Sequence, residues 1–337
     1  MRVRRRRVLI ATGAAAGCAV FGALAQTAAP RKRLACLWIG KSAEFPQSRF
    51  GVEFFSRLQE LGWKDGANVE VINRFAEEDP RRYEALAREI AAANPAVIHA
   101  TFPQAVNAVR KAAPDTPIVF SIVADPVQDG FVKSLARPGG NLTGASTREL
   151  EFFPKRLQLL RELLPKARRI AVLVDVPGPQ GRYPPTARAL QGLVDMGRQS
   201  GIEVVSFDVA SIDDVPALFK HLAAGRFDGL LVFVYVRLAN ERRDAFTQLV
   251  ERARLPAVYG VTEYADRGGL MSFSQSIPEL AQRAAGYVDK ILRGARPAEL
   301  PVEEPNVYEM VVNLKAAKAI GLTIPPSLLL RATRVIE

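Results

Sequence analysis

Short apolar runs rich in β-branched residues alternate with longer amphipathic stretches along this chain. In the first half, the apolar runs lie at 34–40, 68–75, 96–100 and 117–123, and stretches with helical spacing lie at 48–63, 80–93 and 103–113. Successive strands that are joined by helices run parallel, and the helices cover both faces of the sheet. The pattern therefore predicts a parallel sheet between two helical layers.

This alternation stops between residues 124 and 147, where Gly, Pro and Asn are frequent, and then resumes. The second half has expected strands at 169–175, 202–209, 228–235 and 256–260, and helical spacing at 153–165, 186–201, 215–225 and 242–254. The length of the chain suits two domains of ordinary size. We therefore predict the α/β class, with two doubly wound parallel-sheet lobes joined by hinge crossings.

The first residues have the three parts of an export signal. Arginines at positions 4–7 precede an uncharged apolar run, which ends in the small-residue pattern Ala23-Leu24-Ala25. We predict a signal peptide cleaved near Ala25 and a periplasmic location. The consecutive arginines indicate the twin-arginine route, with general secretion as the alternative. A membrane anchor is a weaker alternative, because the run is shorter than the roughly 20 apolar residues of a membrane span.

Lipid attachment at Cys18 is a further alternative, although the usual leucine three places before the cysteine is replaced by Ala15. Removing residues 1–25 lowers the formal charge from +11 to +6, since that segment holds five arginines and no acid. The remaining charges are interspersed, so we expect no nucleic-acid partner. Only Cys36 remains after cleavage, which excludes an intramolecular disulfide.

Ligands of such sheets bind beyond the carboxyl ends of the strands. The corresponding loops lie at 42–45, 101–104, 124–127, 176–178, 235–237 and 260–264, and they supply hydroxyl, amide, aromatic or single carboxylate groups. None of these loops carries a catalytic set, and the chain has no glycine-rich nucleotide fingerprint, phosphate loop or nucleophile elbow. His99 and His221 are the only histidines and lack metal-ligand spacing. We therefore expect no enzyme activity, no catalytic residues, no cofactor and no metal.

Several sequence strings carry a resemblance to a known family. They are LQELGWKDGANVEV (58–71), PIVFSIVADPV (117–127), LARPGGNLTGAST (135–147), KRLQLLRELLPKARRIAVLVD (155–175), RRDAFTQLVERARLPAVYG (242–260), GGLMSFS (268–274) and NLKAAKAIGLTIPPSLLLRATRVIE (313–337). In this order, the chain resembles ABC transporter substrate-binding proteins of the type I periplasmic-binding fold, and more narrowly the tryptophan- and tyrosine-associated solute-binding group.

This resemblance implies a receptor whose two lobes close on a small solute and deliver it to a permease and an ATPase in the inner membrane. We expect a monomer with lobe 1 at 34–143 plus about 275–308, and lobe 2 at 144–274 plus about 309–337. The implied hinge crossings lie near 143–147, 260–276 and 305–313. The alternative function is a periplasmic sensory or partner receptor that uses the same clamp to signal to a membrane protein.

The loop positions that match the family's strand ends are the predicted ligand-binding residues: Ser42, Phe45, Thr101, Gln104, Asp125, Tyr183, Tyr235 and Glu263. Thr101 and Gln104 flank a helix start, where backbone N–H groups can hold a carboxylate. Asp125 is the candidate for a ligand ammonium group, with a role in capping its own turn as the alternative. Tyr183, Tyr235 and Glu263 are candidates for stacking or hydrogen bonding.

Two of these roles have structural alternatives: Glu263 pairing with an arginine, and Phe45 as an exposed loop aromatic. Two segments depart from the family pattern. Residues 101–104 are bulkier than the small residues common there, and 176–185 is rich in proline. The expected solute is therefore an amino acid, an aromatic acid or another small organic acid.

Overall fold

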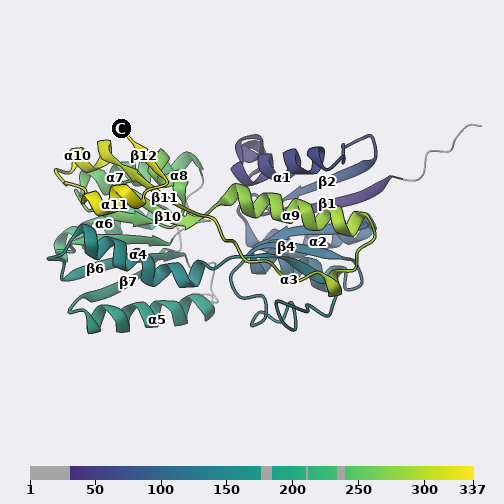
Figure 1. Cartoon of the computed structure of the whole chain (residues 1–337), viewed down its shortest axis with the longest axis horizontal. Coiled ribbons are helices and arrows are strands. Elements are labelled where there is room, and N and C mark those ends of the chain that lie inside the picture. The colour runs from purple at the N-terminus through teal and green to yellow at the C-terminus, as the bar shows by residue number, and fades with distance from the viewer. Residues whose placement is uncertain (1–30, 176–183, 210–211, 234–239) are drawn as a thin grey trace, which may run out of the picture. The chain divides into compact units, whose positions relative to one another are not determined.

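Helices flank two separate β-sheets in the computed structural model, which describes residues 31–175, 184–209, 212–233 and 240–337 (Figure 1). The folded unit extends from Lys32 to Glu337. Two of the predicted ligand residues, Tyr183 and Tyr235, lie outside the described residues.

The first sheet has five parallel strands in the order β2-β1-β3-β4-β5. They are β1 (Lys32–Trp38), β2 (Val69–Phe75), β3 (Val97–Thr101), β4 (Ile118–Val123) and β5 (Leu142–Ser146). Cys36 pairs with Asn73 on one side and with His99 on the other. Both Cys36 and His99 are fully buried, as expected for central strand positions.

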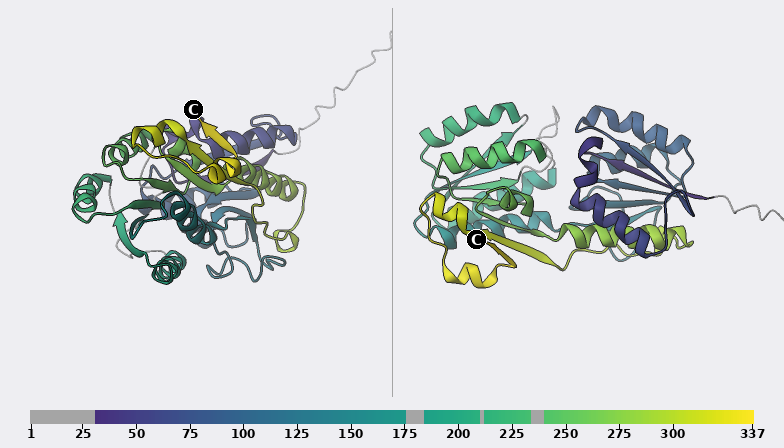
Figure 2. Two further views of the ribbon diagram at one scale, coloured as in Figure 1. Left: turned by 60° about the vertical axis from the view of Figure 1, so that its left-hand side comes forward. Right: turned by 90° about the horizontal axis from the view of Figure 1, so that it is seen from above.

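Helices cover both faces of this sheet and bury its apolar side chains (Figure 2). On one face lie α1 (Arg49–Glu60) and α9 (Ile277–Leu292), and on the other lie α2 (Tyr83–Ala92) and α3 (Phe102–Ala112). Successive strand residues point to opposite faces, so Cys36 packs in the first layer and Leu37 in the second. The near-continuous apolar strands of the sequence follow from this double burial.

The second sheet has seven strands in the order β12-β11-β10-β9-β8-β6-β7, with β11 antiparallel to β10 and the other neighbours parallel. Its strands are β6 (Arg169–Asp175), β7 (Glu203–Val209), β8 (Gly229–Phe233), β9 (Ala257–Tyr259), β10 (Met271–Gln275), β11 (Tyr308–Asn313) and β12 (Arg334–Ile336).

This sheet also lies between two helical layers. One layer contains α4 (Glu149–Leu163), α5 (Pro184–Gln199), α10 (Leu314–Ala319) and α11 (Pro326–Arg331). The other contains α6 (Val215–Ala224), α7 (Asn240–Arg252) and α8 (Thr262–Asp266). Short 3-10 helices are η1 (Ser42–Gln47), η2 (Pro80–Arg82), η3 (Ile212–Asp214) and η4 (Pro297–Glu299).

The described chain passes between elements of the two sheets three times. It leaves β5 through Thr147 and Arg148 to enter α4, and it leaves β10 through Ser276 to enter α9. It returns after Glu303, which bridges Ala145 of the first sheet, and enters β11 at Tyr308.

The predicted fold class is confirmed, since two parallel-dominated sheets are each covered by helices. No strand was predicted between residues 124 and 147, where the alternation stops, but β5 occupies Leu142–Ser146. A Cβ on Gly144 would lie 2.0 Å from the Phe120 carbonyl oxygen, so glycine is needed there for the close approach to β4. The strand was missed because glycine within a short polar segment favours a turn prediction.

Candidate functional site

The 3-10 helix η1 follows β1 and carries the first two predicted ligand residues. Ser42 is exposed, and its backbone N–H donates to Glu77 Oε1 at 3.1 Å. Hydrogen bonds from the Ser42 side chain and then its backbone hold the pKa of Glu77 below the ordinary glutamate value. The half-buried ring of Phe45 lies 4.8 Å from Trp38 and 5.1 Å from Phe75, measured between ring centroids. Phe45 therefore belongs to an aromatic cluster and is not an exposed loop ring.

His99 lies at the buried side of the same aromatic cluster. Its ring stacks on Phe54 with centroids 4.6 Å apart, and its Nε2 lies 3.0 Å from Ser121 Oγ. Burial lowers the pKa of His99 to about 3, so the ring is neutral at physiological pH. This environment gives His99 a packing role.

The junction between β3 and α3 holds the next pair. Thr101 ends β3 with 3% of its surface exposed, whereas Gln104 is exposed in the first turn of α3. Phe102, the first helical residue, has a φ of 65°, an unfavourable value for a residue with a side chain. No side chain caps this helix, so its first N–H groups are not satisfied by a cap.

A second strained residue lies near the end of β4. Ile122 has a φ of 58°, and the β4–β5 register shifts between Ser121 and Val123. A β-branched residue rarely adopts this conformation, and such strain concentrates at functional sites. The bulge precedes Asp125, whose Oδ1 accepts the backbone N–H of Gln128 at 3.0 Å. The Asp125 carboxylate thus caps its own turn, as the structural alternative anticipated.

On the second sheet, Glu263 lies in the first turn of α8, directly after β9. Its Oε2 is buried and has no hydrogen-bond partner among the described residues. In the described part of the chain, no arginine forms a salt bridge with it, so the arginine-pairing alternative finds no support there. A buried carboxylate oxygen without a partner is costly, and each such group requires an explanation.

Arg156 is a buried charge that the sequence did not reveal. It lies on α4, its side chain is fully buried, and it forms a salt bridge with Glu149. Its Nε donates to the Phe273 carbonyl oxygen at 2.7 Å, and its Nη2 donates to the Gly260 carbonyl oxygen at 3.1 Å. Arg156 therefore ties α4 to β10 and to Gly260, which lies in the loop between β9 and α8, two residues before Thr262. An arginine on an amphipathic helix is normally exposed, so the spacing of residues in α4 does not predict that Arg156 is buried.

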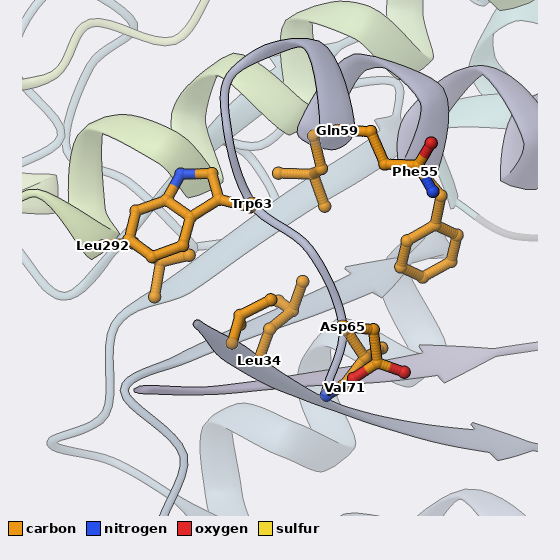
Figure 3. Close-up of a pocket in the computed structure, with 9 residues that line it drawn as sticks. Leu34, Phe55, Gln59, Trp63, Asp65, Val71 and Leu292 are labelled. Atoms are coloured by element: carbon orange, nitrogen blue, oxygen red, sulfur yellow. Dashed lines mark hydrogen bonds between the residues drawn. The ribbon is translucent and has the colours of Figure 1, made fainter. Parts of the chain in front are cut away.

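A pocket lies at the other end of the first sheet, over the beginnings of β1 and β2 (Figure 3). Its lining is mostly apolar: Leu34, Phe55, Leu58, Gln59, Trp63, Asp65, Val69, Val71 and Leu292. Asp65 Oδ1 accepts the Val71 N–H at 2.8 Å, and Trp63 Nε1 donates to Asp289 Oδ1 at 2.8 Å. None of the predicted ligand residues that the structure describes lines this pocket, so the pocket is not the predicted solute site.

In residues 31–175, 184–209, 212–233 and 240–337, no group of three or more His, Cys, Asp or Glu side chains is arranged to hold a metal ion. Within the same ranges, no helix has the length and apolar character that crossing a membrane requires.

The chain belongs to the family of ABC transporter substrate-binding proteins, which matches residues 51–336. Proteins of this family bind a substrate for a transporter and are not enzymes, so the predicted family and the predicted lack of enzyme activity are confirmed.

Individual relatives agree with this assignment. A tyrosine-binding protein from Clostridioides difficile strain R20291 is 24% identical over 269 residues, which cover 80% of this chain and 75% of the relative. A conserved domain protein from Vibrio cholerae has a similar structure, with a TM-score of 0.78, 26% identity, and coverage of 90% of this chain and 99% of that chain.

An ABC domain from Streptococcus pneumonia, solved in complex with L-Trp, has the same TM-score of 0.78 at 21% identity, covering 91% of this chain and 100% of that chain. At this identity, the likeness establishes the fold.

Proposed function

We propose that this protein is the extracytoplasmic solute-binding component of an ABC import system, and that it closes two lobes on a small solute. The family match over residues 51–336 carries this proposal. The proposed lobes are 32–146 plus 277–303, and 149–275 plus 308–337, so the boundaries predicted at 143/144 and about 308/309 move to the end of β5 and to the start of β11. Export through the N-terminal signal, and delivery to a membrane permease with its ATPase, follow from the same proposal.

We place the hinges at Thr147–Arg148, at Ser276 and at residues 304–307, where the chain passes between the two sheets. The third crossing is held to α9 by Arg283, which donates to Glu303 at 2.5 Å and to Asn306 at 3.0 Å. Bending at a few element-terminal residues is the usual geometry of domain closure around a ligand.

We propose an aromatic amino acid as the solute. Two relatives support this class, one described as tyrosine-binding and one solved with L-Trp. The buried Oε2 of Glu263 offers an acceptor for an ammonium group. We favour Glu263 over Asp125 for this role because the Asp125 carboxylate already accepts a bond within its own turn.

The remaining ligand positions stay proposals. The N–H groups of Phe102 and Gln104 at the start of α3 suit the solute carboxylate, because helix N-termini favour anions, whereas Pro103 between them has no N–H to donate. Ser42 and Phe45 would contact the solute from the loop after β1. Tyr183 and Tyr235 are proposed partners from the second lobe.

Thermal unfolding of the solute-free exported protein tests the proposal against amino acids, aromatic acids and small carboxylates. A solute that binds only the folded state adds roughly 2.7 kcal/mol of stability at one hundred times its dissociation constant. We expect L-tryptophan or L-tyrosine to raise the melting temperature, and their D-enantiomers to have a smaller effect. A folded protein that no member of the panel stabilises would contradict nutrient binding and favour the sensory role.

A further inference from the structure

Arg49 extends from α1, a helix that covers the first sheet, to α8 and β11, which belong with the second sheet. It is the first residue of α1, which packs on the first sheet, and Ser48 caps that helix. Arg49 Nη1 donates to Thr262 Oγ1 at 3.0 Å and lies 3.4 Å from Glu309 Oε2. Thr262 begins α8 and Glu309 lies in β11, so the guanidinium joins parts of the chain that are more than two hundred residues apart.

Arg49 is the first residue of α1, a position where an arginine is unfavourable. A positive side chain in the first turn of a helix opposes the helix dipole, so local structure does not favour arginine there. The acceptors in the second sheet supply the compensating interaction. Thr262 is 1% exposed and the Glu309 side chain is 19% exposed, whereas the Arg49 side chain is 39% exposed. Because the Arg49 guanidinium is partly exposed to solvent, its ion pair with Glu309 is weak enough to break and re-form.

The contact also adjoins the proposed solute anchor. Thr262 and Glu263 are consecutive in the first turn of α8. Arg49 therefore holds the same turn that would present the Glu263 carboxylate to the solute. A movement that carries the start of α1 away from α8 and β11 would break the bond to Thr262 and the ion pair with Glu309.

We propose that Arg49, Thr262 and Glu309 form a latch, that the arrangement of the lobes which the latch holds in this structure is the solute-binding one, and that the latch thereby sets solute affinity without touching the solute. This inference rests on the proposed clamp function. A ligand binds more weakly when its binding-competent state is less populated, so losing the latch raises the apparent dissociation constant. Arg49 is thus a positioning residue.

Dissociation kinetics of L-tryptophan, used as the probe, test the latch. We expect Arg49→Ala to raise the dissociation constant about two- to five-fold through faster dissociation, the range for an exposed ion pair. Glu309→Gln should have a similar effect, and the double variant should be no weaker than Arg49→Ala. The difference from wild type should shrink in concentrated salt. Unchanged dissociation in Arg49→Ala, or additive effects in the double variant, would overturn the proposal.

Arg57→Ala is the matched control. Arg57 lies on the same helix with a similarly exposed side chain, but its partner is Glu60 at 2.8 Å on that helix. This variant should bind L-tryptophan as the wild type does.

A second measurement keeps the latch testable if L-tryptophan does not bind. Spin labels on Ser56→Cys in α1 and Gln248→Cys in α7, both exposed positions, report the separation of the lobes in solute-free protein. Arg49→Ala should lengthen or broaden this distance distribution, and an unchanged distribution would overturn the latch. Absence of L-tryptophan binding with a lengthened distribution would contradict the proposed solute but leave the latch standing.

Discussion

His99 shows how burial sets the charge of a single side chain in this protein. The ring lies among aromatic neighbours and has one hydrogen-bond contact, with Ser121. Its pKa of about 3 in the folded chain compares with about 6.5 for an exposed histidine. The folded chain therefore excludes a proton that the unfolded chain binds in mild acid.

We expect His99 to make the protein less stable as the pH falls. Between about pH 6.5, where the unfolded chain protonates, and about pH 3, the free energy of unfolding should fall by about 1.4 kcal/mol per pH unit from this group. His99→Phe removes this slope because phenylalanine does not titrate. Urea unfolding across the pH range measures it. His221→Gln, at an exposed histidine, should keep the slope, and equal slopes in His99→Phe and wild type would contradict the account.

Replacing Arg156 should lower the stability of the folded protein more than replacing an exposed arginine. Arg156→Met leaves Glu149 without its salt bridge and leaves the Phe273 and Gly260 carbonyl oxygens without this donor. Removing one partner of a buried ion pair typically costs about 3–5 kcal/mol. Chemical denaturation should show a loss of this size. Arg161→Met, at an exposed arginine on the same helix, should change stability by at most about 0.5 kcal/mol, and comparable losses in both variants would refute the role.

Among the secondary-structure elements, β5 packs beside β4 through close approach of the two backbones at Gly144 and Phe120, where a larger side chain would not fit. The Cβ of an alanine at Gly144 would lie 2.0 Å from the Phe120 carbonyl oxygen, so β4 and β5 would have to separate. We expect Gly144→Ala to destabilise the protein by about 3 kcal/mol or more, since overpacking of this kind forces backbone shifts. Gly140→Ala, which meets nothing within 4 Å, is the control. Equal melting temperatures for the two variants would show that the strands separate freely.

Most strands and helices were predictable because their apolar spacing reflects burial between two layers. The run predicted at 169–175 coincides with β6, and the helix predicted at 48–63 contains α1. β5 was not predictable, because it is defined by a close backbone contact between Gly144 and Phe120 and not by apolar spacing. The loops that follow the strands were predictable, but the strained φ values at Phe102 and Ile122 were not, because apolar spacing does not report backbone strain.

The candidate site was predictable only as a set of loops. Spacing placed Glu263 at the end of a strand, but only the fold shows that its Oε2 is buried without a partner. Asp125 has the same sequence context, and the fold shows its carboxylate engaged in a turn. Two carboxylates that both follow a strand thus differ in whether they can accept a hydrogen bond from the solute. The difference is that the Asp125 carboxylate already accepts a hydrogen bond within the described part of the protein, whereas Glu263 Oε2 does not.

At the scale of the whole molecule, closure requires that solute binding change the separation of the lobes. The crossings at Thr147–Arg148, Ser276 and 304–307 are short, so bending there would move each sheet with its helices as a rigid body. We expect the radius of gyration from solution X-ray scattering to fall when the solute saturates the protein. An unchanged radius at saturation would indicate binding without closure.

Calorimetric titration with L-tryptophan and L-tyrosine measures whether the protein binds an aromatic amino acid. We expect one solute per chain, bound with a negative heat-capacity change because binding buries apolar surface. Glu263→Gln should weaken binding about ten- to hundred-fold, as expected for loss of a charged hydrogen bond. Asp125→Asn, which retains an acceptor for its turn, should bind nearly as tightly as wild type. Absence of saturable binding, or wild-type affinity in Glu263→Gln, would contradict the proposed site.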